Sequence, residues 1–310
     1  MSPQPPSVAI EIAAGRVTVA ELGRGAAGPV VSAFASESLP AGVVAPSLTE
    51  PNITDTPAVT GAIRQAFEKA GLRPPRRAAL VVPDSVARVS LLTFEQLPSK
   101  PADVDELIRW QIRKATPFPL DSARVAHVVT HQEPGETTLA AIVARIDVIA
   151  QYERAVTALG IQPGIVDLAS VNVVNAVLAG GAAPAGDWLL VCVAQESTSL
   201  VIVRSGELVF YRHRLAIDEE PLGALVHQTA MYHEDRLSGG KFARVWLCGS
   251  TWAASGDAVR REISQRLGVE AEPVDVRVAA TFGDRIGVRP EVLDAIAAPL
   301  GVLLRERKVA

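Results

Sequence analysis

Residues 191–208, VCVAQESTSLVIVRSGEL, have the pattern of a β-hairpin: an apolar strand, a small polar turn and a second apolar strand. The same pattern occurs about 180 residues earlier, where VAIEIAAGRVTVAEL covers residues 8–22. In both copies we expect a turn of five small or polar residues, followed by a third strand and a helix. The repetition predicts two copies of one α/β unit. Their hairpins would face a shared cleft, where turn amides could hold a phosphate.

The composition restricts the class of protein. Hydrophobic residues make up 48% of the 310 residues, charged residues 21% and aromatic residues 5%, which favours a core of aliphatic strands. A formal net charge of −4 argues against nucleic acid as a partner, because binding to backbone phosphates requires a basic surplus. The two cysteines, Cys192 and Cys248, exclude a disulfide framework and a zinc site of several thiolates. With no signal peptide and no apolar window of about 20 residues, we expect a cytoplasmic protein without a membrane span.

The order of the predicted elements divides the chain into five segments. A helix should begin with Thr56 as its cap and Pro57 in its first turn, and a C-terminal helix should kink or restart at Pro299. The expected segments are the N-terminal part of a first domain (1–85), an inserted α+β module (86–164), a return to the first domain (165–182), a second domain (183–284) and a C-terminal helix that packs back on the core (285–310).

Several motifs occur in one order along the chain. They are Pro83-Asp84 with Arg88, Leu97-Pro98, a helix through Trp110 that ends in Pro117-Phe118-Pro119, and AAIVARIDVIAQYERAVTALGIQPGIVDLASVNVVNA at residues 140–176. This series resembles the type IV pilus assembly protein PilM family, whose relatives include FtsA and the cytoplasmic part of GspL. The resemblance implies an actin-like α/β fold, in which a ribonuclease-H-like domain is duplicated to give two domains. The first of these domains carries a small inserted α+β module.

The resemblance also identifies where a nucleotide would bind. Both phosphate turns of the family read D-I-G. In the first turn of this chain, Glu11 replaces the Asp and Ala13 replaces the Gly. In the second turn, Cys192 replaces the Asp and Ala194 replaces the Gly. The family's adenosine-side G-G is Gly249-Ser250 here. Since a cysteine is a poor Mg²⁺ ligand and alanine adds a Cβ where backbone approaches phosphate, we expect hydrolysis to be lost. ATP or ADP with Mg²⁺ could still bind through Gly15, Ser197 and Thr198, but we favour ordinary polar turns with no cofactor.

The partner implied by the resemblance is the N-terminal cytoplasmic tail of a PilN-like inner-membrane protein. This tail would lie in a groove between the inserted module and its parent domain, with Trp110, Pro117 and Phe118 as candidate anchors. The expected function is a cytoplasmic scaffold of a type IV pilus or related envelope machine. Its partner would recruit it to the inner face of the inner membrane, and pilus assembly platform proteins would be further partners. The alternatives are an active ATPase, a sugar-kinase-like phosphotransferase and an FtsA-like division scaffold.

The remaining polar residues have a simpler interpretation. His227 and His233 are six residues apart on a predicted helix and so do not share a face, which predicts two surface histidines. His127 and His131 have no evident partner in the sequence. Ser85, Ser170 and Ser250 lack the G-x-S-x-G elbow of a hydrolase, so acyl-transfer chemistry has no support.

Overall fold

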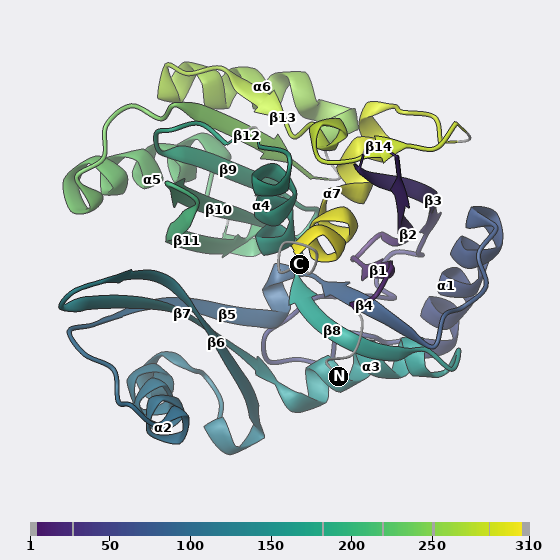
Figure 1. Ribbon diagram of the computed structural model, residues 1–310, viewed down its shortest axis with the longest axis horizontal. Helices are drawn as coiled ribbons and strands as arrows, with labels where there is room; N and C mark the ends of the chain where they lie inside the picture. The colour runs from purple at the N-terminus through teal and green to yellow at the C-terminus, as the bar shows by residue number, and fades with distance from the viewer. Residues whose placement is uncertain are drawn as a thin grey trace.

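The computed structural model describes residues 5–26, 28–181, 183–218, 220–249, 252–284 and 286–305. Its strands form three sheets (Figure 1). The first has the strand order β14 (Thr281–Phe282), β3 (Gly28–Ser38), β2 (Arg16–Gly25), β1 (Val8–Ile12), β4 (Arg77–Val82), β8 (Gln162–Leu168). The second has the order β11 (Glu207–Leu215), β10 (Ser197–Arg204), β9 (Trp188–Val193), β12 (Arg244–Cys248), β13 (Ala271–Pro273). The third is β5 (Ala87–Phe94), β7 (Glu136–Arg145), β6 (Ala123–Glu133).

The two large sheets are copies of one topology. In each, the first three strands form an antiparallel meander, and the fourth strand pairs in parallel with the first. A fifth strand then pairs in parallel with the fourth. Even the irregularity is repeated, since the register shifts between Glu21 and Leu22 in one copy and between Ile202 and Val203 in the other. The predicted duplication of an α/β unit is therefore confirmed.

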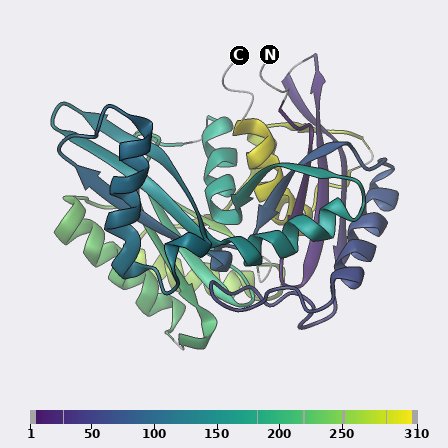
Figure 2. The ribbon, with the colours of Figure 1, turned by 90° about the horizontal axis from the view of Figure 1, so that it is seen from below.

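The helices arrange these sheets in layers (Figures 1 and 2). The apolar side chains of α1 (Thr56–Ala70) and α3 (Ile146–Thr157) cover one face of the six-stranded sheet. Between the two large sheets lie α4 (Ala169–Ala179) and α7 (Pro290–Arg305). The outer face of the second sheet is covered by α5 (Leu222–Leu237) and α6 (Trp252–Leu267), and α2 (Pro101–Ile112) packs on the third sheet. Within the described residues, no helix is long and apolar enough to cross a membrane.

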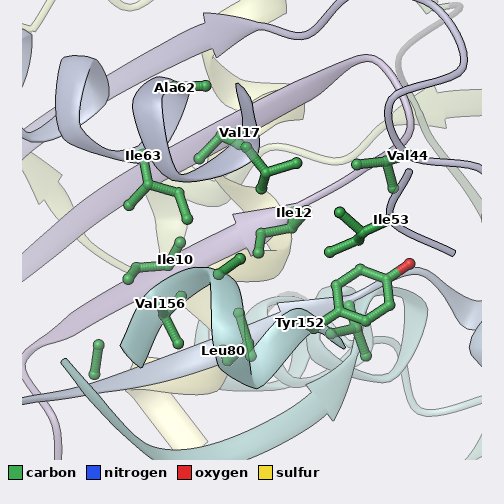
Figure 3. Close-up of a cluster of buried hydrophobic side chains, with 14 of the residues drawn as sticks. Ile10, Ile12, Val17, Val44, Ile53, Ala62, Ile63, Leu80, Tyr152 and Val156 are labelled. Carbon is green, nitrogen blue, oxygen red and sulfur yellow. The ribbon is translucent and has the colours of Figure 1, made fainter. Parts of the chain in front are cut away.

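The strands of the first domain are rich in aliphatic residues because their side chains fill the core (Figure 3). Ile10, Ile12 and Leu80 project from neighbouring strands toward Ile63 of α1 and Tyr152 of α3, and all five side chains are fully buried. The Tyr152 hydroxyl donates to the side chain of Asn52 at 2.9 Å, so its polar atom is also paired inside the protein. Burial of such side chains stabilises the fold by about 1.5–3 kcal/mol each.

The start of α1 corrects one expectation, and the course of α7 excludes the restart expected at Pro299 as one of two alternatives. Asp55, and not Thr56, caps α1, because the Asp55 carboxylate accepts a hydrogen bond from the Ala58 amide at 2.9 Å. The C-terminal helix runs through Pro299 without a new start. It packs closely on α4: a Cβ at Gly301 would lie 1.7 Å from the Asn172 carbonyl oxygen, so only glycine allows this crossing.

The inserted module contains the three-stranded sheet and α2. Helix α3, which we placed in the module, contacts α1 and buries Val148, Tyr152 and Val156 in the core of the first domain. These contacts favour an end of the module near Arg145, where β7 stops. The segment boundaries given above remain a prediction.

Three of the histidine predictions are wrong. His233 is fully buried: its ring stacks on Phe242 with centroids 4.5 Å apart, and its Nε2 lies 2.5 Å from the Asp187 carboxylate. His127 has a partner on α2, because its Nδ1 lies 3.4 Å from the Asp105 carboxylate. His131 has a partner in another part of the chain, because its Nδ1 lies 2.7 Å from the Glu207 carboxylate at the start of β11. The contact between His131 and Glu207 links the inserted module to the second large sheet.

Candidate functional site

The two repeated hairpins meet at a cleft between the large sheets. Each closes with the same hydrogen bond, from the Ala13 amide to the Arg16 carbonyl at 2.9 Å and from the Ala194 amide to the Ser197 carbonyl at 2.8 Å. Each turn therefore has two central residues, and the expectation of five-residue turns is wrong because the strands extend further. A Cβ built on Gly15 would lie 3.6 Å from the Gln195 side chain, so the two turns approach each other closely.

The cleft has a volume of about 400 Å³. Of the residues expected to bind a nucleotide, Glu11, Gly15, Ser197 and Gly249 line it, whereas Thr198 does not. Ser250 lies outside the described residues. The other polar residues of the lining include Arg16, Asp84, Ser170, Cys192, Glu196, Ser199 and Asp294.

The charges in the cleft are arranged unlike those of a polyphosphate site. Its charged lining, within the described residues, consists of four carboxylates and the Arg16 guanidinium, which lies 3.3 Å from the Glu11 carboxylate. Burial raises the pKa of Glu11, of Glu196 and of Asp294, and the attraction of Arg16 opposes this rise. A net negative, partly desolvated lining repels phosphate groups.

The residues that would receive Mg²⁺ and a nucleotide do not fit that ligand. Cys192 stands opposite Cys248 on the neighbouring strand; a hydrogen bond with Cys192 and burial raise the pKa of the Cys248 thiol. Neutral thiols are poor ligands for Mg²⁺, and the described residues contain no group of three or more His, Cys, Asp or Glu side chains able to hold a metal ion. The Gly249 amide donates to the Asp294 carboxylate at 2.5 Å, so it is not free to bind a ligand.

Gly249 is required by the packing of the protein itself. Its φ is +143°, and a Cβ there would lie 1.7 Å from the Val193 carbonyl oxygen. The glycine that we expected on the adenosine side thus allows two backbone segments of the second domain to touch.

Asp84, which sequence reasoning did not place in a site, joins the two halves of the cleft. Its carboxylate accepts from the Ser170 amide at 3.1 Å and from the Ser199 hydroxyl at 2.6 Å. Ser170 lies in the first turn of α4 in the first domain, and Ser199 lies on β10 in the second. An acidic residue two positions after the buried strand AALVV was the available signal, because such strand ends lie where ligands and domains meet.

A second cavity, of about 280 Å³, separates the inserted module from the first domain. We call it the groove. One wall is the edge strand β6 with its neighbour β7, and the other is the edge strand β8 with α3. Its apolar lining includes Ala126, Ile142, Ile149, Ile165 and Leu168. At its rim, Arg124 of β6 pairs with Glu153 of α3 at 3.1 Å, and Arg305 of α7 pairs with Asp167 of β8.

The sequence model of the family described as type IV pilus assembly protein PilM matches residues 9–217. The chain belongs to the PilM family. No curated protein matched this PilM-family chain.

Solved structures share the fold of this PilM-family chain. A structure described as the PilM-PilN type IV pilus biogenesis complex has a TM-score of 0.83 and 18% identity, over 98% of this chain and 99% of that one. The cytoplasmic domain of EpsL, an inner membrane component of the type II secretion system of Vibrio cholerae, has a TM-score of 0.51 and 9% identity, over 98% and 94%. A Bacteroides thetaiotaomicron protein with an actin-like ATPase fold has a TM-score of 0.52 and 8% identity, over 96% and 95%. The predicted actin-like fold is confirmed.

The three residues suggested as partner contacts lie away from both cavities of this PilM-family protein. Trp110 is 70% exposed on the outer side of α2, and Pro117 is exposed in the loop that follows. Phe118 is half-buried against the apolar cluster between α2 and the third sheet. Their role in binding a partner therefore remains a prediction, whereas much of the groove lining comes from the motif at residues 140–176.

Proposed function

We propose that this chain is a cytoplasmic scaffold of a type IV pilus machine and binds the N-terminal tail of a PilN-like inner-membrane protein in the groove. The observation that carries the proposal is a groove flanked by the free edges of two sheets, β6 and β8, above an apolar floor. Such an edge can add an extended peptide by main-chain hydrogen bonds, and apolar pockets then select its side chains. The tail would hold the protein at the inner face of the inner membrane, where pilus assembly platform proteins would be its further partners.

The similar structure of a PilM-PilN complex supports the choice of a PilN-like partner. It is described as a complex of PilM with PilN, and it aligns with this chain over almost its whole length. A disordered tail that becomes extended in a groove loses conformational entropy, so we expect moderate affinity per unit of buried area.

Calorimetric titration with a synthetic N-terminal peptide of the PilN-like protein from the same organism tests the groove. Ala126 is exposed on the groove face of β6, so Ala126→Glu places a charge in the groove and should weaken binding at least tenfold. Val129→Glu is the matched control. Val129 lies on the same strand, by alternation on the face that carries Ala123 and Val125 toward α2, and its substitution should leave the affinity within about twofold of wild type. Absence of binding by the wild type would contradict the assigned partner, and equal binding by Ala126→Glu would contradict the assigned groove.

We further propose that the cleft no longer hydrolyses ATP. The support comes from Cys192 at the position of a carboxylate, from the Glu11–Arg16 pair and from the excess of acidic residues in the lining. With about 1 mM ATP or ADP and Mg²⁺, the melting temperature should not change, because only a ligand that binds the folded state raises it. Phosphate release should equal that of a buffer blank. A concentration-dependent rise in melting temperature would show that nucleotide still binds, and phosphate release above the blank would restore the active ATPase as the better interpretation.

A further inference from the structure

Three buried side chains and the half-buried His213 form a continuous series of hydrogen bonds across the molecule. The Ser85 Oγ lies 3.1 Å from His213 Nε2, His213 Nδ1 lies 2.9 Å from the Ser199 Oγ, and Ser199 donates to Asp84 Oδ2 at 2.6 Å. Asp84, Ser85 and Ser199 are between 2% and 7% exposed. Water therefore has little access to the bond between Ser199 and Asp84, which makes that bond costly to break.

The partners determine the direction of each bond. Since the proton of Ser199 is given to the Asp84 carboxylate, the Ser199 oxygen must accept from His213 Nδ1–H. In a neutral imidazole with its proton on Nδ1, the other ring nitrogen, Nε2, accepts the Ser85 proton. A charged ring would instead donate from Nε2 to the Ser85 oxygen. Burial lowers the pKa of His213, which favours the neutral ring; the charged groups that face it are Asp84, Arg214 and Asp218.

The series connects the two halves of the protein. Asp84 and Ser85 form a short 3₁₀ turn, Asp84–Val86, directly after β4 of the six-stranded sheet. Ser199 and His213 are cross-strand partners on β10 and β11 of the second sheet. Two hydrogen bonds, at the two ends of the series, therefore cross the boundary between the halves.

The same residues adjoin the groove. Val82 and Leu168 line the groove at the ends of β4 and β8, while Asp84 and Ser170, two residues further along each chain segment, line the cleft. The bond from the Ser170 amide to Asp84 ties these two segments together at 3.1 Å. A peptide that fixes β8 would thereby also fix the acceptor of the Ser199 bond.

We propose that the Ser85–His213–Ser199–Asp84 series is a latch that holds the cleft closed and that a peptide in the groove tightens it. The latch itself concerns the free protein. The statement that a peptide tightens the latch rests on the proposed peptide binding in the groove.

Two measurements test the latch, with Ser199→Ala and Ser85→Ala as variants. In the free protein at one pH, amide hydrogen exchange should rise about threefold to tenfold in residues 83–86 of Ser199→Ala, although the substitution is in the other half. For the peptide, the dissociation constant should rise about threefold to tenfold for Ser199→Ala and less for Ser85→Ala, because the competent closed state is less populated. Thr229→Val is the control: it removes a buried hydroxyl that bonds only within α5 and to Arg212, and should change neither readout.

The outcomes separate the two proposals. If exchange rises only near Ser199 itself, or if Thr229→Val changes residues 83–86 equally, the series is not a latch between the halves. If exchange behaves as expected but all variants bind the peptide as wild type does, the link to the groove is wrong. If the wild type binds no peptide while exchange in residues 83–86 still rises in Ser199→Ala, the proposed partner fails and the latch stands.

Discussion

The cleft and the groove adjoin each other at the ends of β4 and β8, yet the residues that line them differ in chemistry. In the cleft, several charged and polar groups are paired within the protein, Glu11 with Arg16, the Gly249 amide with Asp294 and Ser199 with Asp84, whereas the buried Arg16 Nε and Ser170 Oγ have no hydrogen-bond partner among the described residues. The groove has an apolar lining between two strand edges, with ion pairs only at its rim. The difference supports the two proposals that the cleft acts as a joint between domains and that the groove binds a ligand.

The most severe way to break the joint is to place a side chain at Gly249. Gly249→Ala puts a Cβ against the Val193 carbonyl at a φ that alanine rarely adopts, and should lower the free energy of unfolding by about 4 kcal/mol. Chemical denaturation measures this loss. Gly240→Ala is the control, because no atom lies within 4 Å of the added Cβ and its φ is not positive; a similar loss there would show that the clash at Gly249 is not the cause.

A smaller effect is expected when the Arg16 guanidinium is removed. Arg16→Met leaves the buried Glu11 carboxylate without its partner and should cost about 3 kcal/mol at pH 7, near the low end for a buried pair because the arginine is partly exposed. Arg16→Lys should recover part of the loss, and Arg16→Met/Glu11→Gln should recover most of it. A double variant no better than the single one would show that Arg16 acts through packing and not through charge.

The pH dependence of stability probes the latch at the boundary of the cleft. The pKa of His213 is lower in the folded than in the unfolded protein, so the unfolded chain takes up the proton first as the pH falls. The stability contributed by His213 is thus present above its unfolded pKa of about 6.5 and is lost below it, at up to about 1.4 kcal/mol per pH unit.

Comparison of wild type with His213→Gln between pH 7.5 and pH 5 isolates this contribution. The variant should lose less stability on acidification than the wild type does. His131→Gln should act in the opposite sense, since the hydrogen bond to Glu207 raises the pKa of His131 and its contribution is lost as the pH rises. If the stability of wild type and of His213→Gln falls in parallel with pH, then His213 is not held in its neutral form in the folded protein.

The smallest effect should come from Trp110, on the outer side of α2. Trp110→Ala should change the free energy of unfolding by less than about 0.5 kcal/mol, because the side chain is 70% exposed, and should leave binding of the tail peptide unchanged. Calorimetric titration measures the second part. A loss of affinity would extend the peptide contact beyond the groove and restore Trp110 as an anchor.

The sequence predicts best what depends on local pattern. The duplicated hairpins were visible because an apolar run, a small turn and another apolar run are enough to specify a hairpin. The lengths of the turns were not visible, because Arg16 and Ser197, which begin β2 and β10, are polar residues that fit a turn as well as a strand.

The site depends on contacts between distant segments, and there the sequence said less. Ser199 stands at the polar start of β10 and His213 between two arginines of β11, as in any solvated strand end, and only the packing of the two halves brings them to Asp84. His233 was misjudged for the same reason: helical spacing excluded a pair with His227 but could not indicate Asp187 or Phe242. The resemblance implied a groove beside the inserted module, and much of its lining comes from the motif at residues 140–176, but the sequence did not indicate which side chains of that motif face it.

The place of α7 between the two large sheets has a consequence for synthesis of the protein. The face of the first sheet that α7 covers, built from β1, β2 and β4, is made early in translation, but residues 290–305 follow β4 only after about 200 further residues. At a bacterial ribosome this delay lasts about 10–40 s. During that time the part of this face that α7 covers in the folded protein remains without that helix. The growing chain should therefore be a substrate for ribosome-associated chaperones until its last helix has emerged.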